Sequence, residues 1–201
     1  MERERKEDLF FSADIESDGP VPGVYSMLSF ALVVAGTFDG AQFRRAERLD
    51  QTFYAELKPV TDSFDPEALA VSGLSRERLM REGRDPAEAM RACAAWVDEL
   101  AQGKTPVLVG YPLGFDWSFL AYYFTVFAGR SPFGHSRGFD TKTAAALLTG
   151  VPVGAAGRAG LPAGLQSSRP HTHGALDDAL EQAEVLANVM ALLGPRGSAA
   201  R

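Results

Sequence analysis

The sequence predicts an α/β sandwich built on a mixed sheet, and two observations carry this prediction. The first third of the chain contains strand patterns joined by short connections, which is typical of an antiparallel meander. From residue 85 onward, helical spacing of apolar residues alternates with short apolar runs. We expect one domain over residues 1–193 and a disordered tail over residues 194–201.

Three segments near the start are predicted as strands. In residues 8–16, the odd positions from 9 to 15 are apolar and share one face, while Ser12, Asp14 and Glu16 share the other. Residues 26–36 are nearly all apolar, as in a strand buried on both faces. Residues 51–57 add a third strand. This arrangement places two carboxylates at one end of a central strand.

The rest of the chain reads as helices around one clear strand, residues 106–110. Asp85 and Asp140 are candidate N-caps, and Pro86 stands at a first helical position. The segment 150–172 is rich in Gly, Ala, Pro and Ser, which predicts a long mobile loop. The predicted helices cover about 86–100, 115–128, 141–148 and 175–192.

Charge and composition narrow the function classes. A formal net charge of −6 argues against a general nucleic-acid coating protein, which carries a broad basic face. The negative charge argues less against an enzyme that binds only a few terminal nucleotides, because metal ions can supply positive charge in its active site. The chain shows no membrane span or secretory signal, and its single cysteine, Cys93, fits a reducing compartment. We expect a cytoplasmic protein that does not bind membranes.

Asp14 and Glu16 form the first candidate site. A spacing of two on a strand puts both carboxylates on one face, where they repel each other unless a cation lies between them. A solvated outer face explains most such pairs. Here the opposite face is apolar, and the glycines and prolines of residues 19–23 open a loop beside the pair. Carboxylates at the end of a buried strand need compensation.

Asp116 is the second candidate, and it is the only acid between Glu99 and Asp140. It stands at the start of a helix rich in aromatic residues. One explanation is a first-turn carboxylate stabilised by the helix dipole. The flanking Phe115 and Trp117 favour a buried functional acid equally well, so both interpretations stay open.

The third candidate is the segment 171–178, at a junction between loop and helix. His173 precedes Asp178 by five residues, a spacing that can bring an imidazole beside a metal-binding carboxylate. Asp177 and Asp178 flank opposite sides of the apolar stripe, so helical geometry does not choose between them. His171 and His173 could also form a metal-binding pair.

In this order and spacing the motifs resemble the DEDDh exonuclease family, which includes the proofreading epsilon subunit of bacterial DNA polymerase III and ribonuclease T. The family pattern D-x-E, F-D and H-x4-D spans most of the chain and leaves Asp177 at a variable position. Two departures affect expected substrate contacts: Ser17-Asp18-Gly19 after the first motif, and Tyr111-Pro112 where many members carry His-Asn. The pattern maps onto Asp14, Glu16, Asp116, His173 and Asp178.

The resemblance implies a ribonuclease H-like αβα sandwich with a five-stranded mixed sheet, three antiparallel strands first and two parallel additions after them. It also implies a metal-dependent 3′→5′ exonuclease that releases nucleoside monophosphates from the 3′ end of single-stranded DNA or RNA. His173 would accept a proton from the attacking water. Two Mg²⁺ or Mn²⁺ ions would be held by Asp14, Glu16, Asp116 and Asp178, with Asp14 bridging both.

Other function classes remain in view. The same fold can serve as a docking subunit in a larger nucleic-acid-processing assembly, and a homodimer is also open. A metallohydrolase acting on small phosphodiesters or very short oligonucleotides would suit the acidic charge. A nucleotide-binding protein of another type lacks support, because the chain has no G-x-x-x-x-G-K-[ST] loop, no glycine-rich dinucleotide motif and no C-x-x-C pair.

Overall fold

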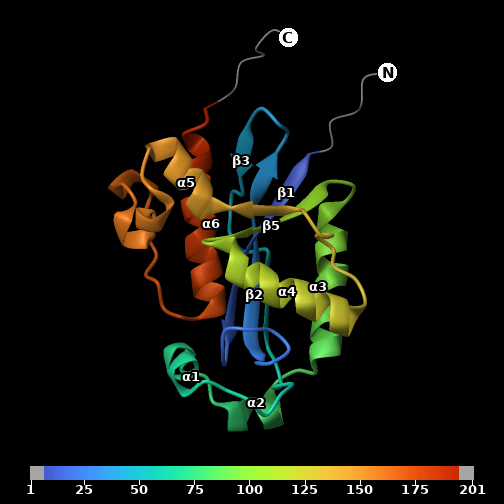
Figure 1. Ribbon diagram of the computed structural model, residues 1–201. Coiled ribbons are helices and arrows are strands. Elements are labelled where there is room, and N and C mark those ends of the chain that lie inside the picture. The colour runs from blue at the N-terminus through green and yellow to red at the C-terminus, as the bar shows by residue number, and fades with distance from the viewer. Residues whose placement is uncertain (1–6, 195–201) are drawn as a thin grey trace.

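The computed structural model describes residues 7–194 and has a mixed sheet between layers of helices (Figure 1). Residues 195–201, nearly all of the predicted tail, lie outside the described residues, as do residues 1–6. The strands are β1 (Asp8–Ser17), β2 (Met27–Phe38), β3 (Phe43–Arg45), β4 (Thr52–Glu56), β5 (Thr105–Gly110) and β6 (Gly138–Asp140). The helices are α1 (Pro66–Ser72), α2 (Arg76–Glu82), α3 (Pro86–Ala101), α4 (Leu113–Ala128), α5 (Thr141–Thr149) and α6 (Ala175–Ala191).

The central strand is β1, in the sheet order β3–β2–β1–β5–β6, with β4 also paired to β2. β1 runs antiparallel to β2 and parallel to β5, and β6 continues in parallel beside β5. The sandwich class is therefore confirmed, but the expected count of five strands is wrong for residues 7–194, where the sheet has six. The additional strand is β3, which is three residues long and has two exposed arginines, so it carries no alternating pattern.

Each face of the sheet packs against its own helices (Figure 1). The odd-numbered apolar residues of β1 join α3 and α4 in one cluster, while Phe10 joins Ala179 and Ala183 of α6 in the other. β2 is buried on both faces, as its composition predicts. Because α6 covers the face that bears Asp14, this helix can bring further side chains to the polar end of β1.

The predicted helix caps are confirmed. The carboxylate of Asp85 accepts a hydrogen bond from the Glu88 N–H at 3.0 Å, and that of Asp140 accepts one from the Thr143 N–H at 2.6 Å. Such caps contribute about 1 kcal/mol each. Asp140 also accepts a hydrogen bond from the Leu113 N–H at 2.7 Å, so it links the starts of α5 and α4. No helix within residues 7–194 is long and apolar enough to cross a membrane.

The short helices α1 and α2 lie beyond one end of the sheet and were not predicted (Figure 1). α1 has no buried residue and α2 buries only Leu79, so neither shows a helical apolar stripe. They are joined to β1 through Asp18, which is fully buried and forms an ion pair with Arg76. The Asp18 backbone carbonyl also accepts a hydrogen bond from the Asp65 N–H at 2.7 Å.

The segment 150–172, predicted as a long mobile loop, is a long connection between α5 and α6 that contains short helical turns. It folds into three turns of 3₁₀ helix, Val153–Ala155, Arg158–Gly160 and Ala163–Leu165. Leu161 and Leu165 are buried against Val185 and Val189 of α6. These turns were not predicted because the apolar residues follow neither a helical nor a strand period, so only the packing shows them.

Candidate active site

Four carboxylates from three elements converge at the end of β1. Asp14 and Glu16 come from β1, Asp116 from the first turn of α4, and Asp178 from the first turn of α6. Ligand atoms of Asp14, Glu16 and Asp178 lie within 4.8 Å of one another. All four side chains line a cleft of about 180 Å³.

Asp116 faces the strand and does not cap its helix. Its side chain is buried, and Oδ1 accepts a hydrogen bond from the backbone N–H of Ile15 at 3.1 Å. The N-cap of α4 is Pro112, which has no side-chain cap bond. Close packing at Gly110 brings α4 near β5, since a Cβ there would lie 2.7 Å from the Cα of Leu113. The structure therefore shows the burial that the second interpretation expects, and the functional role of Asp116 stays a prediction.

The structure also separates Asp178 from Asp177. Asp178 is 1% exposed, and its two oxygens accept hydrogen bonds from the backbone N–H groups of Thr172 and His173, at 2.9 and 3.1 Å. Asp177 is exposed and contacts the hydroxyl of Thr172 at 3.3 Å. Only Asp178 reaches the carboxylate cluster.

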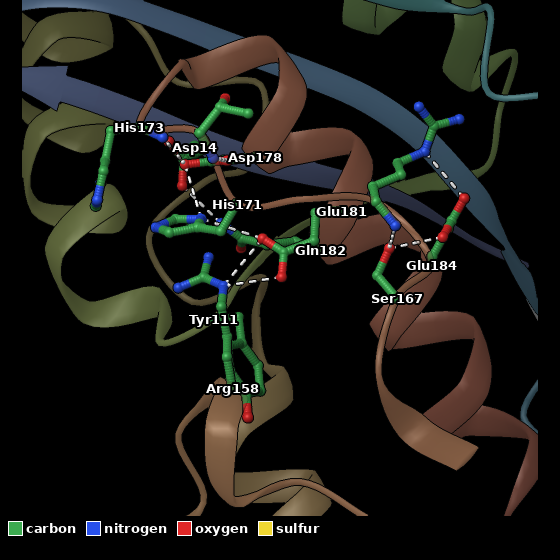
Figure 2. Close-up of polar contacts among 12 residues, drawn as sticks. Asp14, Tyr111, Arg158, Ser167, His171, His173, Asp178, Glu181, Gln182 and Glu184 are labelled. Carbon is green, nitrogen blue, oxygen red and sulfur yellow. Dashed lines mark hydrogen bonds and ion pairs between the residues drawn. The ribbon is translucent and has the colours of Figure 1, made fainter. Parts of the chain in front are cut away.

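Both histidines line the cleft, but their surroundings differ (Figure 2). Nδ1 of His171 lies 2.9 Å from Oδ2 of Asp178 and 3.1 Å from Oε2 of Glu181. The ring of His173 is exposed and stands edge-on to that of His171, with centroids 4.5 Å apart. His173 has a left-handed backbone, φ +57°, and touches Asp178 through its backbone N–H. Ligand atoms of both histidines and Asp178 lie within 4.8 Å, so the histidine pair stays open.

Burial raises the pKa of Asp14, Glu16 and Asp116, and neighbouring acids add to this effect at Asp14 and Glu16. Burial first, and then the charges of Asp116, Glu16 and Asp178, raise the pKa of Asp14 well above its ordinary value. Burial, followed by Asp178 and Asp116, raises the pKa of Glu16 to about 8. Burial raises the pKa of Asp116 to about 7, against the hydrogen bond from Ile15. The repulsion would be relieved by a cation, and a set of carboxylate oxygens fits the hard ions Mg²⁺ and Mn²⁺.

Several site residues were missed by the sequence reasoning. Nε2 of Gln182 donates to Oδ1 of Asp14 at 2.6 Å, and Nε of Arg158 donates to both oxygens of Glu181 at 3.1 and 3.0 Å (Figure 2). Gln182 lies four residues after Asp178, one helical turn away, so spacing was a usable signal. Arg158 had no such signal, because its position depends on how the 150–172 segment folds.

Residues 134–138 match the G-x-S-x-G pattern of serine hydrolases. That motif requires the serine on a sharp turn between a strand and a helix. Ser136 instead lies in an exposed turn that leads into β6. The match therefore does not indicate a nucleophile.

A central strand that ends in paired acids, completed by acids from two helices, is the arrangement that the resemblance to the DEDDh exonucleases implies. No family model matches the chain. The 3′-5′ DNA exonuclease Cap18 of Escherichia coli is 41% identical over 128 residues, which are 63% of this chain and 63% of that protein. The match thus spans less than two thirds of the length of this curated relative.

Solved structures share the fold over nearly the whole chain. The nuclease domain of 3′hExo, a DEDDh family member bound to rAMP, has a TM-score of 0.63 and 11% identity, covering 98% of this chain and 96% of that one. Escherichia coli Exonuclease I in complex with a dT13 oligonucleotide has a TM-score of 0.59 and 16% identity, covering 94% of this chain and 41% of that one. The chain is therefore similar in sequence to a 3′-5′ DNA exonuclease and in fold to a DEDDh nuclease domain, which agrees with the resemblance seen in its motifs.

Proposed function

We propose that this chain is a metal-dependent 3′→5′ exonuclease that releases nucleoside monophosphates from single-stranded nucleic acid. The observation that carries the proposal is the convergence of Asp14, Glu16, Asp116 and Asp178 in one cleft. A phosphodiester is anionic, so this cluster suits it only with cations between them. The similarity to Cap18, which is named as a DNA exonuclease, makes DNA the first substrate to test.

The proposed ligands of the first ion follow from the geometry, and those of the second from the resemblance to the DEDDh family. Asp14, Glu16 and Asp178 would hold one ion, since their ligand atoms lie within 4.8 Å of one another. Asp14 would also contact a second ion, supported by Asp116. When bound, two Mg²⁺ or Mn²⁺ ions neutralise the phosphate and clamp the attacking and leaving oxygens of an in-line displacement.

We assign proton acceptance to His173. Its ring stands exposed at the rim of the cleft, where it can turn toward an attacking water. A histidine suits this role because its ordinary pKa, about 6.5, is near neutral pH. His171 has Nδ1 already occupied by Asp178 and Glu181, so it would orient the carboxylate of Asp178.

The test is digestion of 5′-labelled single-stranded DNA and RNA of equal length, with Mg²⁺ and with EDTA. We expect shortening from the 3′ end, release of nucleoside monophosphates, and no product in EDTA. An Asp14→Asn variant purified in parallel controls for a contaminating nuclease. Failure of the wild-type chain to shorten either substrate in Mg²⁺ would refute the proposal.

The proposal also covers the location of the enzyme, its domain organisation and its oligomeric state. Cys93 is buried and unpaired, which is compatible with a cytoplasmic enzyme. We also propose that residues 1–193 act as one domain. Light scattering of the active protein would decide between a monomer and a homodimer.

A further inference from the structure

Arg158 is the only lysine or arginine among residues 7–194 that lines the carboxylate cleft. It begins the second 3₁₀ turn of the 150–172 segment. Its Nε donates to both oxygens of Glu181, and its guanidinium lies 5.6 Å from the centre of the Tyr111 ring (Figure 2). Glu181 and Tyr111 therefore hold the guanidinium beside the acids of the cluster.

The contacts of Arg158 leave donors free. A guanidinium has five N–H groups, and the described contacts with Glu181 use Nε alone. The two terminal nitrogens have no hydrogen-bond partner within residues 7–194, and the side chain is 32% exposed. Its charge also acts on the cluster, where it lowers the pKa of Asp14 and of Asp116 against the effect of burial.

A second arginine of the same segment shows what a purely structural contact looks like. Nε of Arg169 donates to Oε1 of Glu184 at 2.9 Å, just as Nε of Arg158 donates to Glu181. Both pairs fasten the segment to α6. Arg169, however, lines a neighbouring hollow with Gln166 and Ser167 and takes no part in the carboxylate cleft. Of these two arginines, only Arg158 both pairs with a glutamate of α6 and lines the carboxylate cleft.

We propose that Arg158 is a catalytic residue that binds a phosphate of the substrate strand through its two terminal nitrogens. The proposal rests on the proposed exonuclease function and names a residue that this function would use. The planar fork of arginine matches two phosphate oxygens, and a charged donor in a partly buried cleft stabilises the charge that builds up on the phosphate. Glu181 orients the fork in advance, so less conformational entropy is lost on binding.

The kinetic test compares Arg158→Ala, Arg158→Lys and Arg169→Ala on labelled single-stranded DNA. We expect Arg158→Ala to lower kcat/KM by on the order of 10- to 100-fold, the effect of losing a hydrogen bond to a charged group. Lysine should restore only part of the loss, because it cannot offer a planar fork. Arg169→Ala should remain close to wild type. Equal losses of kcat/KM in both alanine variants would mean that Arg158 only holds the 150–172 segment against α6, and this result would overturn the proposal.

A binding test separates this proposal from the proposed function. Affinity for a 5′-labelled oligonucleotide with phosphorothioate linkages at its 3′ end is measured across salt concentrations in Mn²⁺. Loss of one phosphate contact should reduce the salt slope by roughly 0.7 in Arg158→Ala and leave it unchanged in Arg169→Ala. The Mn²⁺-induced rise in Tm should survive in both variants. An unchanged slope, or a lost rise in Tm, would overturn the role of Arg158, whereas an inactive wild type would overturn the exonuclease function.

Discussion

Gln182 donates a hydrogen bond to Asp14 across 2.6 Å, and this contact joins α6 to the central strand β1. The side chain of Gln182 is 2% exposed, and its Oε1 has no hydrogen-bond partner within residues 7–194. Because an amide nitrogen can only donate, the contact fixes one oxygen of Asp14 and leaves the other available to a cation. One turn of α6 thus supplies both a carboxylate, Asp178, and the group that orients another.

We therefore expect Gln182→Leu to weaken Mn²⁺ binding by about 10-fold or more, the usual effect of removing a group that orients a metal ligand. The variant should fold, since leucine is similar in size and the substitution also removes the buried Oε1 of Gln182, which has no hydrogen-bond partner within residues 7–194. The measurement is the Mn²⁺ concentration that gives half of the maximal rise in Tm. Asn188→Ala is the matched control, because this amide of α6 bonds to the Gln166 carbonyl away from the cluster. Wild-type Mn²⁺ affinity in Gln182→Leu would show that the contact does not orient Asp14.

Divalent ions should stabilise the folded protein and be required for turnover. An ion that binds only the folded state at 100 times its dissociation constant adds about 2.7 kcal/mol to the free energy of unfolding. We expect Tm to rise with millimolar Mn²⁺ and activity to vanish in EDTA. Asp14→Asn should show a much smaller rise in Tm. Full turnover in excess EDTA would contradict the assignment of the four carboxylates as metal ligands.

The metal-free protein should lose stability as pH rises. Glu16 and Asp116 have a folded-state pKa of about 8 and about 7, above their unfolded values near 4, so the folded state binds more protons between these limits. The free energy of unfolding then falls as pH increases from about 4 to 8. Asp116→Asn should flatten this dependence and keep the Ile15 hydrogen bond, yet lose most activity. Chemical denaturation in EDTA across this pH range measures the effect, and a wild-type curve that is flat or rises with pH would contradict it.

Substitution of the two histidines should affect different properties, turnover for His173 and Mn²⁺ binding for His171. His173→Asn should lower the turnover rate by about 10²–10⁴-fold, the usual contribution of a general base, while Mn²⁺ binding stays near wild type. His171→Asn should instead weaken Mn²⁺ binding, because Nδ1 of His171 contacts Asp178 and Glu181. A loss of turnover in His171→Asn, together with normal turnover in His173→Asn, would move the base two residues earlier.

The amino-acid sequence by itself determined the local features that set up this site. The two-residue period of β1 separates the apolar face from Asp14 and Glu16, and the caps at Asp85 and Asp140 start helices where their side chains bind backbone N–H groups. Both depend on residues a few positions apart, so they can be read along the chain. The order and spacing of the acidic motifs likewise indicated the fold class.

Only the tertiary structure decided which side chains meet. In the folded chain Asp178 lies in the cluster, whereas Asp177 is exposed. The side chain of Asp116 points toward Ile15. The fold of the 150–172 segment brings Arg158 into the cleft. Gln182 and Asp14 are 168 positions apart, and no local period connects them. The burial that raises the pKa of the carboxylates likewise exists only after the layers have packed. Periodicity reports on which face a residue lies, whereas the partner on that face depends on how distant elements pack against one another.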